Sequence, residues 1–164
     1  MIIKSGGICY LFDFDGTICG QENYEGFFKS IKEWFKSGPY IKPDEFDIRW
    51  SILTGRPYMD KPFVRAYCAM YGLMPDVILT TDTFFYPFKS EQEKWQWKVD
   101  TIKKIVQHKI LELCELRPLM ISKVIYIDND MNTIRYINSW RKGESSFIAA
   151  TVRDFIKGNL ELLL

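Results

Sequence analysis

The stretch that decides the fold is residues 8–17, Ile8-Cys9-Tyr10-Leu11-Phe12-Asp13-Phe14-Asp15-Gly16-Thr17. Its apolar first half is typical of a strand that is buried on both faces of a sheet. Two acids, Asp13 and Asp15, follow where that strand ends. Because an unpaired buried carboxylate is costly, these acids require a metal, a partner or an exposed strand end. Ligands bind beyond the carboxyl ends of the strands in open parallel sheets, so the position predicts a functional site.

A surface turn is the alternative interpretation of Asp-x-Asp-Gly, with Gly16 supplying a positive φ. The longer string Asp-x-Asp-Gly-Thr is rarer, and at average residue usage it arises by chance in well under about one chain in a hundred. We therefore favour a functional site over a turn, and the later motifs described below strengthen that interpretation.

The composition is that of an ordinary globular domain. The 164 residues are 47% apolar and 26% charged, and this length supports one well-buried core, so we expect a single domain over residues 1–164. The net charge of +1 provides no global field that would favour nucleic acid or a membrane, although local basic patches are compatible with it.

Cysteine usage and the first residues predict a cytoplasmic protein. Cys9, Cys19, Cys68 and Cys114 form no Cys-x-x-Cys pair and lie in or beside apolar stretches, which is typical of reduced structural thiols. The N-terminal residues lack the pattern of a secretory signal. No apolar run approaches the roughly 20 residues that span a bilayer, so we expect no membrane contact.

Apolar patterns along the chain alternate between the strand period and the helix period. We expect strands at residues 8–14, 47–53, 77–80, 123–127 and 147–150, and helices at residues 24–35, 61–70, 97–116 and 130–140. This alternation predicts right-handed βαβ crossovers and a parallel sheet covered on both faces. The expected fold class is therefore α/β, a three-layer α/β/α arrangement of the Rossmann-like kind.

A second polar motif, Thr54-Gly55-Arg56, closes the second expected strand. One interpretation is a strand-to-helix turn in which Thr54 acts as a cap. We favour the other, in which Thr54 and the neighbouring amides donate hydrogen bonds to a phosphate oxygen. Arg56 either contacts the substrate or braces the loop, and both interpretations stay open.

The fourth expected strand also ends in acids, with Asp128 and Asp130 following residues 124–127. We interpret Asp128 as a functional carboxylate for the same reason as the acids after the first strand. Asp130 caps the next helix, and it is also a candidate partner for a lysine of the site.

The motifs resemble those of the haloacid dehalogenase superfamily in sequence and in order. Residues 13–17 are similar to the family's first motif at each position, residues 53–56 to its second, and Asp128 to the metal ligand of its fourth. The resemblance covers nearly the whole chain and implies a haloacid-dehalogenase-like fold. Around Thr83, Trp97 and residues 125–128 the chain also looks like the small domains of this family associated with RNA repair, and more loosely like polynucleotide 3′-phosphatases.

A phosphate site of this type needs a cation, and a lysine supplies a compact point charge. The family places a lysine at the start of the helix before the fourth strand. Lys98 fits best, because it falls in the first turn of the expected helix 97–116, ahead of the apolar stripe. Lys94, Lys103 and Lys104 compete with it.

The resemblance also implies a cofactor and ligands for it. Mg²⁺ is typically bound by one or two carboxylates together with substrate phosphate. The family's ligands correspond to Asp13, Asp128 and the backbone carbonyl of Asp15. Phosphate binding is expected from the remaining matched positions, Gly16, Thr17, Gly55 and Arg56.

By the same resemblance, the expected activity is Mg²⁺-dependent hydrolysis of a phosphomonoester. Asp13 attacks phosphorus and forms an aspartyl phosphate, while Asp15 protonates the leaving oxygen and later activates water. Thr54 and Lys98 complete the catalytic set. Relatives that cleave carbon–halogen bonds generally lack the second acid, so Asp15 implies phosphoryl transfer, and Thr17 fits the phosphatase form of the motif.

The spacing of the motifs leaves no room for the cap domain that encloses the site in many relatives. We therefore expect a minimal cap or none, and an open site that accepts a small phosphorylated molecule or a nucleic-acid end. The aromatic segment 84–88, followed by Trp95 and Trp97, is expected to pack on the core or in an oligomer interface, and the alternative is base stacking.

Three other functions stay open. One is a polynucleotide 3′-phosphatase of nucleic-acid end repair, and another is a phosphotransferase that uses the same residues. The third is a catalytically silent binding module, since a fold does not guarantee an activity. The intact set of four motif residues weighs against this last function: Asp13, Asp15, Thr54 and Asp128.

Overall fold

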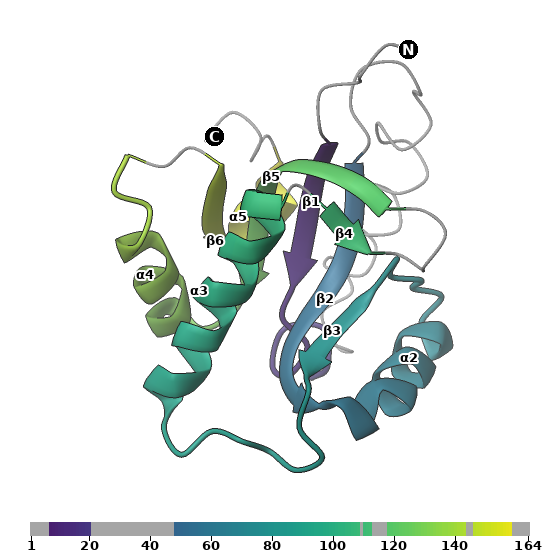
Figure 1. The fold of residues 1–164 in the computed structure, drawn as a ribbon. Helices are drawn as coiled ribbons and strands as arrows, with labels where there is room; N and C mark the ends of the chain where they lie inside the picture. The colour runs from purple at the N-terminus through teal and green to yellow at the C-terminus, as the bar shows by residue number, and fades with distance from the viewer. Residues whose placement is uncertain (1–6, 21–47, 109, 113–117, 144–145, 159–164) are drawn as a thin grey trace.

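Five parallel strands form the centre of the molecule in the computed structural model, which describes residues 7–20, 48–108, 110–112, 118–143 and 146–158 (Figure 1). The strands are β1 (Gly7–Phe12), β2 (Ile48–Pro57), β3 (Ile78–Thr81), β5 (Pro118–Asp128) and β6 (Phe147–Thr151). Their order across the sheet is β3-β2-β1-β5-β6, so the first strand of the chain lies at the centre. A short strand, β4 (Ile110–Glu112), pairs antiparallel with the beginning of β5. The predicted α/β class with a parallel, Rossmann-like sheet is confirmed.

Helices cover both faces of the sheet in the described part of the chain (Figure 1). They are α2 (Lys61–Met70), α3 (Glu91–His108), α4 (Met131–Ser139) and α5 (Val152–Lys157), and one 3₁₀ turn, η2 (Tyr58–Asp60), joins β2 to α2. Helices α3 and α4 pack on one face, and α2 and α5 on the other. None of these helices combines the length and apolar character that a membrane crossing requires.

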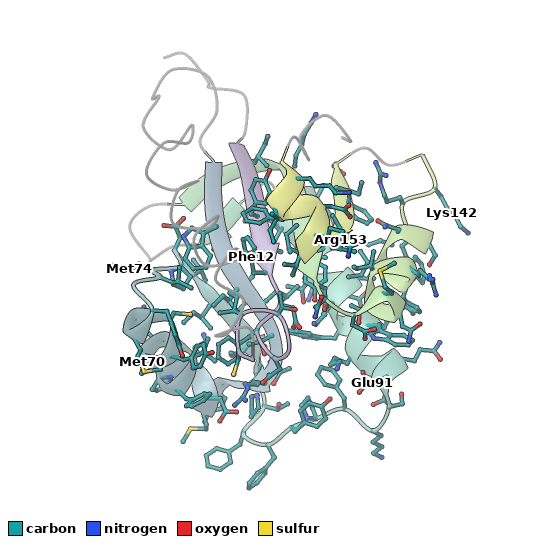
Figure 2. All side chains as sticks on the ribbon, turned by 180° about the vertical axis from the view of Figure 1, so that it is seen from behind. Phe12, Met70, Met74, Glu91, Lys142 and Arg153 are labelled. Atoms are coloured by element: carbon teal, nitrogen blue, oxygen red, sulfur yellow. The ribbon has the colours of Figure 1, made fainter. Side chains whose placement is uncertain are left out.

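Strand β1 separates two hydrophobic cores because its side chains alternate between the faces. Cys9 and Leu11 join the core beneath α3 and α4, whereas Tyr10 and Phe12 join the core beneath α2 and α5. Phe12 lies inside the molecule (Figure 2), where its ring packs edge-on against that of Phe155 at a centroid distance of 5.1 Å. A strand buried on both faces explains the unbroken apolar run in the sequence.

Several expected boundaries agree with the structure and others do not. The expected helix 61–70 is confirmed at both bounds, and the strands expected at 77–80 and 147–150 are confirmed within one residue. The expected helix 24–35 lies outside the described residues. The strand expected at 47–53 is longer than predicted, because β2 continues through Pro57 after a shift in its pairing with β3, and the alternative of a turn at residues 54–56 is therefore wrong.

The longest helix was expected at residues 97–116, but α3 spans Glu91–His108. It begins at Glu91, six residues before the expected start, and the Ser90 hydroxyl accepts a hydrogen bond from the amide of Glu93 at 3.2 Å. This Ser-x-x-Glu pattern is the usual signature of a helix start. Residues 110–112, expected to be helical, form β4 because β5 offers a pairing edge, and pairing overrides local periodicity. Lys98 consequently lies about two turns into α3 instead of in its first turn.

Candidate active site

The two strand-terminal acids lie side by side at the carboxyl edge of the sheet. Asp13 directly follows β1 and Asp128 ends β5, and these strands are parallel neighbours with Phe12 opposite Ile127. The amide of Asp13 donates to the carbonyl of Ile127 at 2.9 Å, which continues the pairing to the end of the sheet. Both carboxyl groups are buried, and both line the same pocket.

Lys98 reaches both acids from α3. Its ammonium nitrogen donates to Asp13 Oδ1 at 2.8 Å and lies 3.6 Å from Asp128 Oδ2. The lysine is only 2% exposed, and a buried ammonium is tolerated when carboxylates and hydrogen bonds compensate its charge. Among the competing lysines, Lys94 lines the pocket but pairs with Glu91 at 2.9 Å.

Tyr126 is part of the same hydrogen-bond network, and sequence reasoning did not assign it to the site. Its hydroxyl accepts from the Lys98 ammonium at 2.6 Å and donates to Asp128 Oδ2 at 2.6 Å. Burial raises the pKa of Tyr126 well above its usual value, and the charges of Asp13 and Asp128 raise it further, so the hydroxyl keeps its proton. The sequence did contain a signal for this position. Tyr126 lies two residues before Asp128 in the same strand, and residues two apart in a strand point to the same face of the sheet.

The Thr17 hydroxyl lies between the two carboxylates. Its oxygen is 3.3 Å from Asp13 Oδ2 and 3.4 Å from Asp128 Oδ1, and it accepts a hydrogen bond from the amide of Asn129 at 3.1 Å. A hydroxyl has one proton, so it can donate to only one of these acids at a time. Asp128 Oδ1 also accepts from the amide of Asp130 at 2.9 Å, so Asp13 Oδ2 is the oxygen of the two that retains more capacity for a cation.

The pKa of Asp13 is raised to about 6, mainly because the group is buried. The charge of Lys98 lowers this pKa, and the charge of Asp128 raises it further. A carboxyl group with this pKa is mostly ionised at neutral pH. Asp13 is thus a buried carboxylate that is charged and held in one orientation by Lys98, and such a group can act as a nucleophile.

Asp15 faces solvent and Arg56. Its two carboxylate oxygens accept from Arg56 Nε and Nη2, each at 2.8 Å, while Arg56 Nη1 lies 3.3 Å from Asp60 Oδ2. The guanidinium also packs over the ring of Phe63, 5.0 Å from its centroid. Of the two interpretations left open for Arg56, this geometry favours the one in which it braces the loop after β1.

Thr54 and Gly55 are not among the described residues that line the pocket. Thr54 is buried, and its hydroxyl oxygen accepts from the amide of Arg56 at 3.2 Å. A Cβ at Gly55 would lie 3.1 Å from both Lys94 Cδ and Phe88 Cε2, closer than ordinary packing. Glycine at this position therefore allows the start of α3 to approach β2 closely. The contacts of Thr54 and Gly55 with a phosphate stay a prediction.

The pocket in front of the acids has a volume of about 280 Å³. Its lining residues are Asp13, Asp15, Gly16, Lys94, Lys98, Asp128, Asn129, Asp130 and Thr133. Gly16, with a φ of 75°, turns the chain beside it, so the motif is both a turn and part of the pocket lining. This volume lies near the lower limit of ordinary ligand pockets and suits a small group such as a phosphoryl group.

Asp130 uses both carboxylate oxygens at the beginning of α4. Oδ1 accepts from the amide of Asn132 at 3.0 Å, and Oδ2 accepts from the Thr133 hydroxyl at 2.9 Å. The geometry supports the cap interpretation over that of a partner for Lys98.

Within the described residues, no three acidic, histidine or cysteine side chains gather as a ready metal site. The carboxylate of Asp15 is engaged by Arg56, so Asp13 and Asp128 are the two carboxylates available at the pocket. Mg²⁺ commonly uses one or two carboxylates plus substrate phosphate and water. This donor set fits Mg²⁺ bound together with a substrate, and not a cage made by protein side chains alone.

The aromatic segment after β3 is not a strand packed on the core. Phe84, Phe85 and Tyr86 are exposed, Phe85 by 77% of its surface, whereas Phe88 packs against Trp97 at a centroid distance of 5.8 Å. The expectation of a core position is wrong for the three exposed rings. The ring of Phe84 also contacts Tyr58, two residues after Arg56, at 6.2 Å between centroids.

The arrangement can bind a phosphate group and attack it with a carboxylate, since a held nucleophile, a buried cation and a second acid face one small pocket. Comparisons with models of protein families, with curated proteins and with solved structures find no match for this chain.

Proposed function

We propose that this protein is a Mg²⁺-dependent phosphomonoesterase of the haloacid dehalogenase type, with Asp13 as the nucleophile. The observation that carries the proposal is the contact between Asp13 and the buried ammonium of Lys98, beside Asp128 at the carboxyl edge of the sheet. Motifs in the family's order also support the proposal, and the assignment of a haloacid-dehalogenase-like fold is part of it.

The proposed reaction has two steps. The Asp13 carboxylate forms a bond to phosphorus, the bond from phosphorus to the leaving oxygen breaks, and Asp15 gives that oxygen a proton. Water then attacks the aspartyl phosphate, Asp15 takes a proton from the water, and Asp13 and phosphate are released. Asp15 has to separate from Arg56 in this cycle, because both of its oxygens are engaged in that ion pair.

Lys98 and the polar groups around it hold Asp13 in place and offset negative charge on the transferring phosphoryl group. Asp13 and Asp128 would hold Mg²⁺, with the backbone carbonyl of Asp15 as the third ligand implied by the family resemblance. When bound, the ion supplies positive charge to the phosphoryl oxygens and helps to orient them.

The direct test is release of phosphate from p-nitrophenyl phosphate with Mg²⁺ present. We expect turnover by the wild-type chain and a loss on the order of 10³-fold or more in Asp13→Asn, because the nucleophile is removed. Asp82→Asn, which removes an exposed acid outside the pocket, is the matched control and should behave as wild type. Undiminished turnover by Asp13→Asn, or none by the wild type, would contradict the proposal.

Thermal unfolding provides a second test that does not depend on the choice of substrate. If Mg²⁺ binds the folded protein, a concentration ten times its Kd stabilises the fold by about 1.4 kcal/mol and raises Tm by about 3–5 °C. The rise should disappear in Asp128→Asn and remain in Asp82→Asn. No shift together with no turnover would favour a catalytically silent binding module.

A polynucleotide 3′-phosphatase is the second candidate function, and the exposed rings of Phe84, Phe85 and Tyr86 favour it. Aromatic rings bind unpaired bases by stacking without regard to their sequence. A 3′-phosphorylated oligonucleotide should then be hydrolysed with a higher kcat/KM than mononucleotides or sugar phosphates. Equal or lower values for the oligonucleotide would exclude end repair and leave a general phosphatase or a phosphotransferase.

A further inference from the structure

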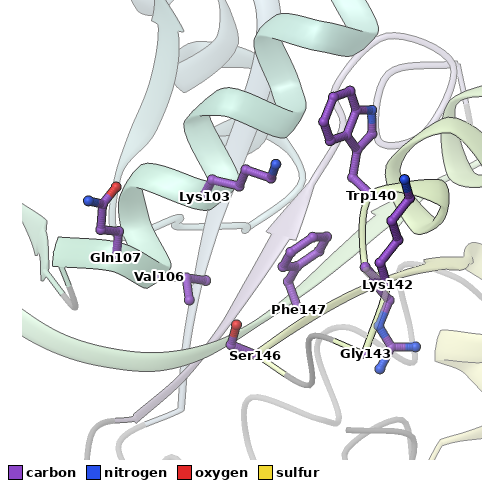
Figure 3. A pocket seen from close by; sticks show the side chains of 9 residues that line it. Lys103, Val106, Gln107, Trp140, Lys142, Gly143, Ser146 and Phe147 are labelled. Carbon is purple, nitrogen blue, oxygen red and sulfur yellow. The ribbon is translucent and has the colours of Figure 1, made fainter.

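A second pocket lies at the opposite end of α3 from the candidate active site, and Figure 3 shows it from close by. It has a volume of about 680 Å³, within the range of sites that hold nucleotide-sized ligands. The second half of α3, the turn after α4 and the start of β6 form its walls. Lys94 and Lys98 line the first pocket and Lys103 lines the second, so one helix contributes to two separate sites.

The second pocket has an apolar floor. Phe147 is 2% exposed and Val106 is half-buried, and both border the cavity together with the ring of Trp140, which is 41% exposed. Ligand sites generally combine such surface with a few placed polar groups. The exposed indole provides a flat surface of the kind that an aromatic ligand contacts.

The polar groups of the pocket are mainly cationic. Lys103 and Lys142 contribute positive charge, Arg141 also borders the cavity but interacts with another group, and none of the nine described lining residues is acidic. This local excess contrasts with a net charge of only +1 for the whole chain. Cations gathered in one concavity raise the local concentration of anions, so the charge selects a negatively charged ligand.

Lys103 is held by a side-chain contact, and Lys142 lies in a turn of unusual backbone conformation. The Lys103 ammonium lies 4.3 Å from the centroid of the Trp140 ring, a cation–π contact, and Figure 3 shows this lysine extending from α3 toward the indole. Lys142 has a φ of 27° and is followed by Gly143 with a φ of 83°. A left-handed conformation is unfavourable for lysine, and the turn after α4 maintains it where the side chain borders the pocket.

We propose that the second pocket binds a nucleotide-sized anion that carries phosphate groups. Lys103 and Lys142 bind the phosphates, and the surface of Trp140, Val106 and Phe147 contacts the aromatic base. The proposal does not rest on phosphatase activity, because it uses neither Asp13 nor the residues around it.

Isothermal titration of the 164-residue chain with ATP, in EDTA and at low ionic strength, tests the proposal. We expect binding by the wild type and at least a tenfold higher Kd for the double variant Lys103→Gln/Lys142→Gln. Lys104→Gln, which removes the same charge from the adjacent exposed position outside the pocket, should change Kd less than twofold. Circular dichroism confirms that each variant is folded, and if the double variant is not, each single variant should raise Kd at least threefold.

A comparison of ligands tests the apolar part of the site. Tripolyphosphate should bind more weakly than ATP, and Trp140→Leu should weaken ATP binding without affecting tripolyphosphate. The proposal is overturned if ATP does not bind, if the double variant binds ATP as the wild type does, or if Lys104→Gln weakens binding equally. Equal Kd values for the two ligands would overturn the assignment to a nucleotide.

Discussion

The Tyr126 hydroxyl joins the cation and the second acid on which the proposed chemistry depends. Without it, Lys98 loses an acceptor and Asp128 loses a donor, although the ring still fills its place in the core. For Tyr126→Phe we expect kcat for an aryl phosphate to fall about 10- to 100-fold with little change in KM, because a supporting contact is lost. We also expect stability to fall by about 1–3 kcal/mol, because buried polar groups lose a partner.

Tyr136→Phe is the matched control for this prediction. The Tyr136 hydroxyl donates to Gln96 on the outer part of α3, so the same chemical change occurs away from the acids. This variant should keep the wild-type kcat. Equal losses of kcat in the two variants would show that Tyr126 acts only through stability.

The thiol of Cys68 provides a residue-scale test of burial. Burial raises the pKa of this thiol to about 12, so at pH 8.5 the thiolate fraction is about 1000-fold smaller than at a pKa of 9. Because the pKa is raised, alkylation of Cys68 by iodoacetamide should be very slow at pH 8.5 in the folded protein and should become rapid in 8 M urea. Mass spectrometry of peptides measures the rate, and labelling at equal rates in both conditions would contradict the buried position.

At the scale of elements, α4 depends on Asp130 for its beginning. The carboxylate accepts hydrogen bonds from the Asn132 amide and the Thr133 hydroxyl, so Asp130→Ala should lower the free energy of unfolding by about 1 kcal/mol. Asp130→Asn retains a capping oxygen and should lose less. Urea denaturation measures both values.

The Asp130→Asn variant also tests whether Asp130 has a catalytic role. If it is only a cap, Asp130→Asn should release phosphate at nearly the wild-type rate. A loss as large as that of Asp13→Asn would instead assign the carboxylate to the chemistry.

At the scale of the whole molecule, the sheet divides the interior into two cores with separate sets of residues. Ile52 lies in the core beneath α2 and α5, and Ile102 lies in the core beneath α3 and α4. Each Ile→Val substitution should cost about 0.5–1.5 kcal/mol. In the double variant the two costs should add to within about 0.5 kcal/mol, because the residues belong to different clusters. Urea denaturation of the three variants tests this, and a larger coupling would mean that the sheet transmits strain between its faces.

Much of the fold was predictable because its local signals agree with one another. Helix α2 has a clear apolar period, and its bounds were predicted correctly. The signals for α3 conflict, since apolar residues continue at the helical period past His108 although residues 110–112 pair with β5. The helix ends there because residues 110–112 pair with β5. A local sequence pattern does not show that such a partner strand lies nearby.

The candidate site was predictable in part for the same reason. Asp13 and Asp128 each follow an apolar strand, and parallel strands bring such positions to one edge. The ion pair of Arg56 with Asp15 joins groups 41 residues apart and was not foreseen, and neither was the position of Thr54 outside the described lining of the pocket.

The sequence by itself determined the bounds of α2, the position of the central strands, which side chains are apolar, and which strands end in acids, because these properties follow from the order of residues along the chain. Only the tertiary structure decided that Lys98 contacts Asp13 across 85 residues and that Thr17 bridges to Asp128 across 111. It also decided that three cations border a pocket at the far end of α3. Contacts of this kind depend on how helices pack on the sheet, and that packing is set by the whole core and not by any one segment.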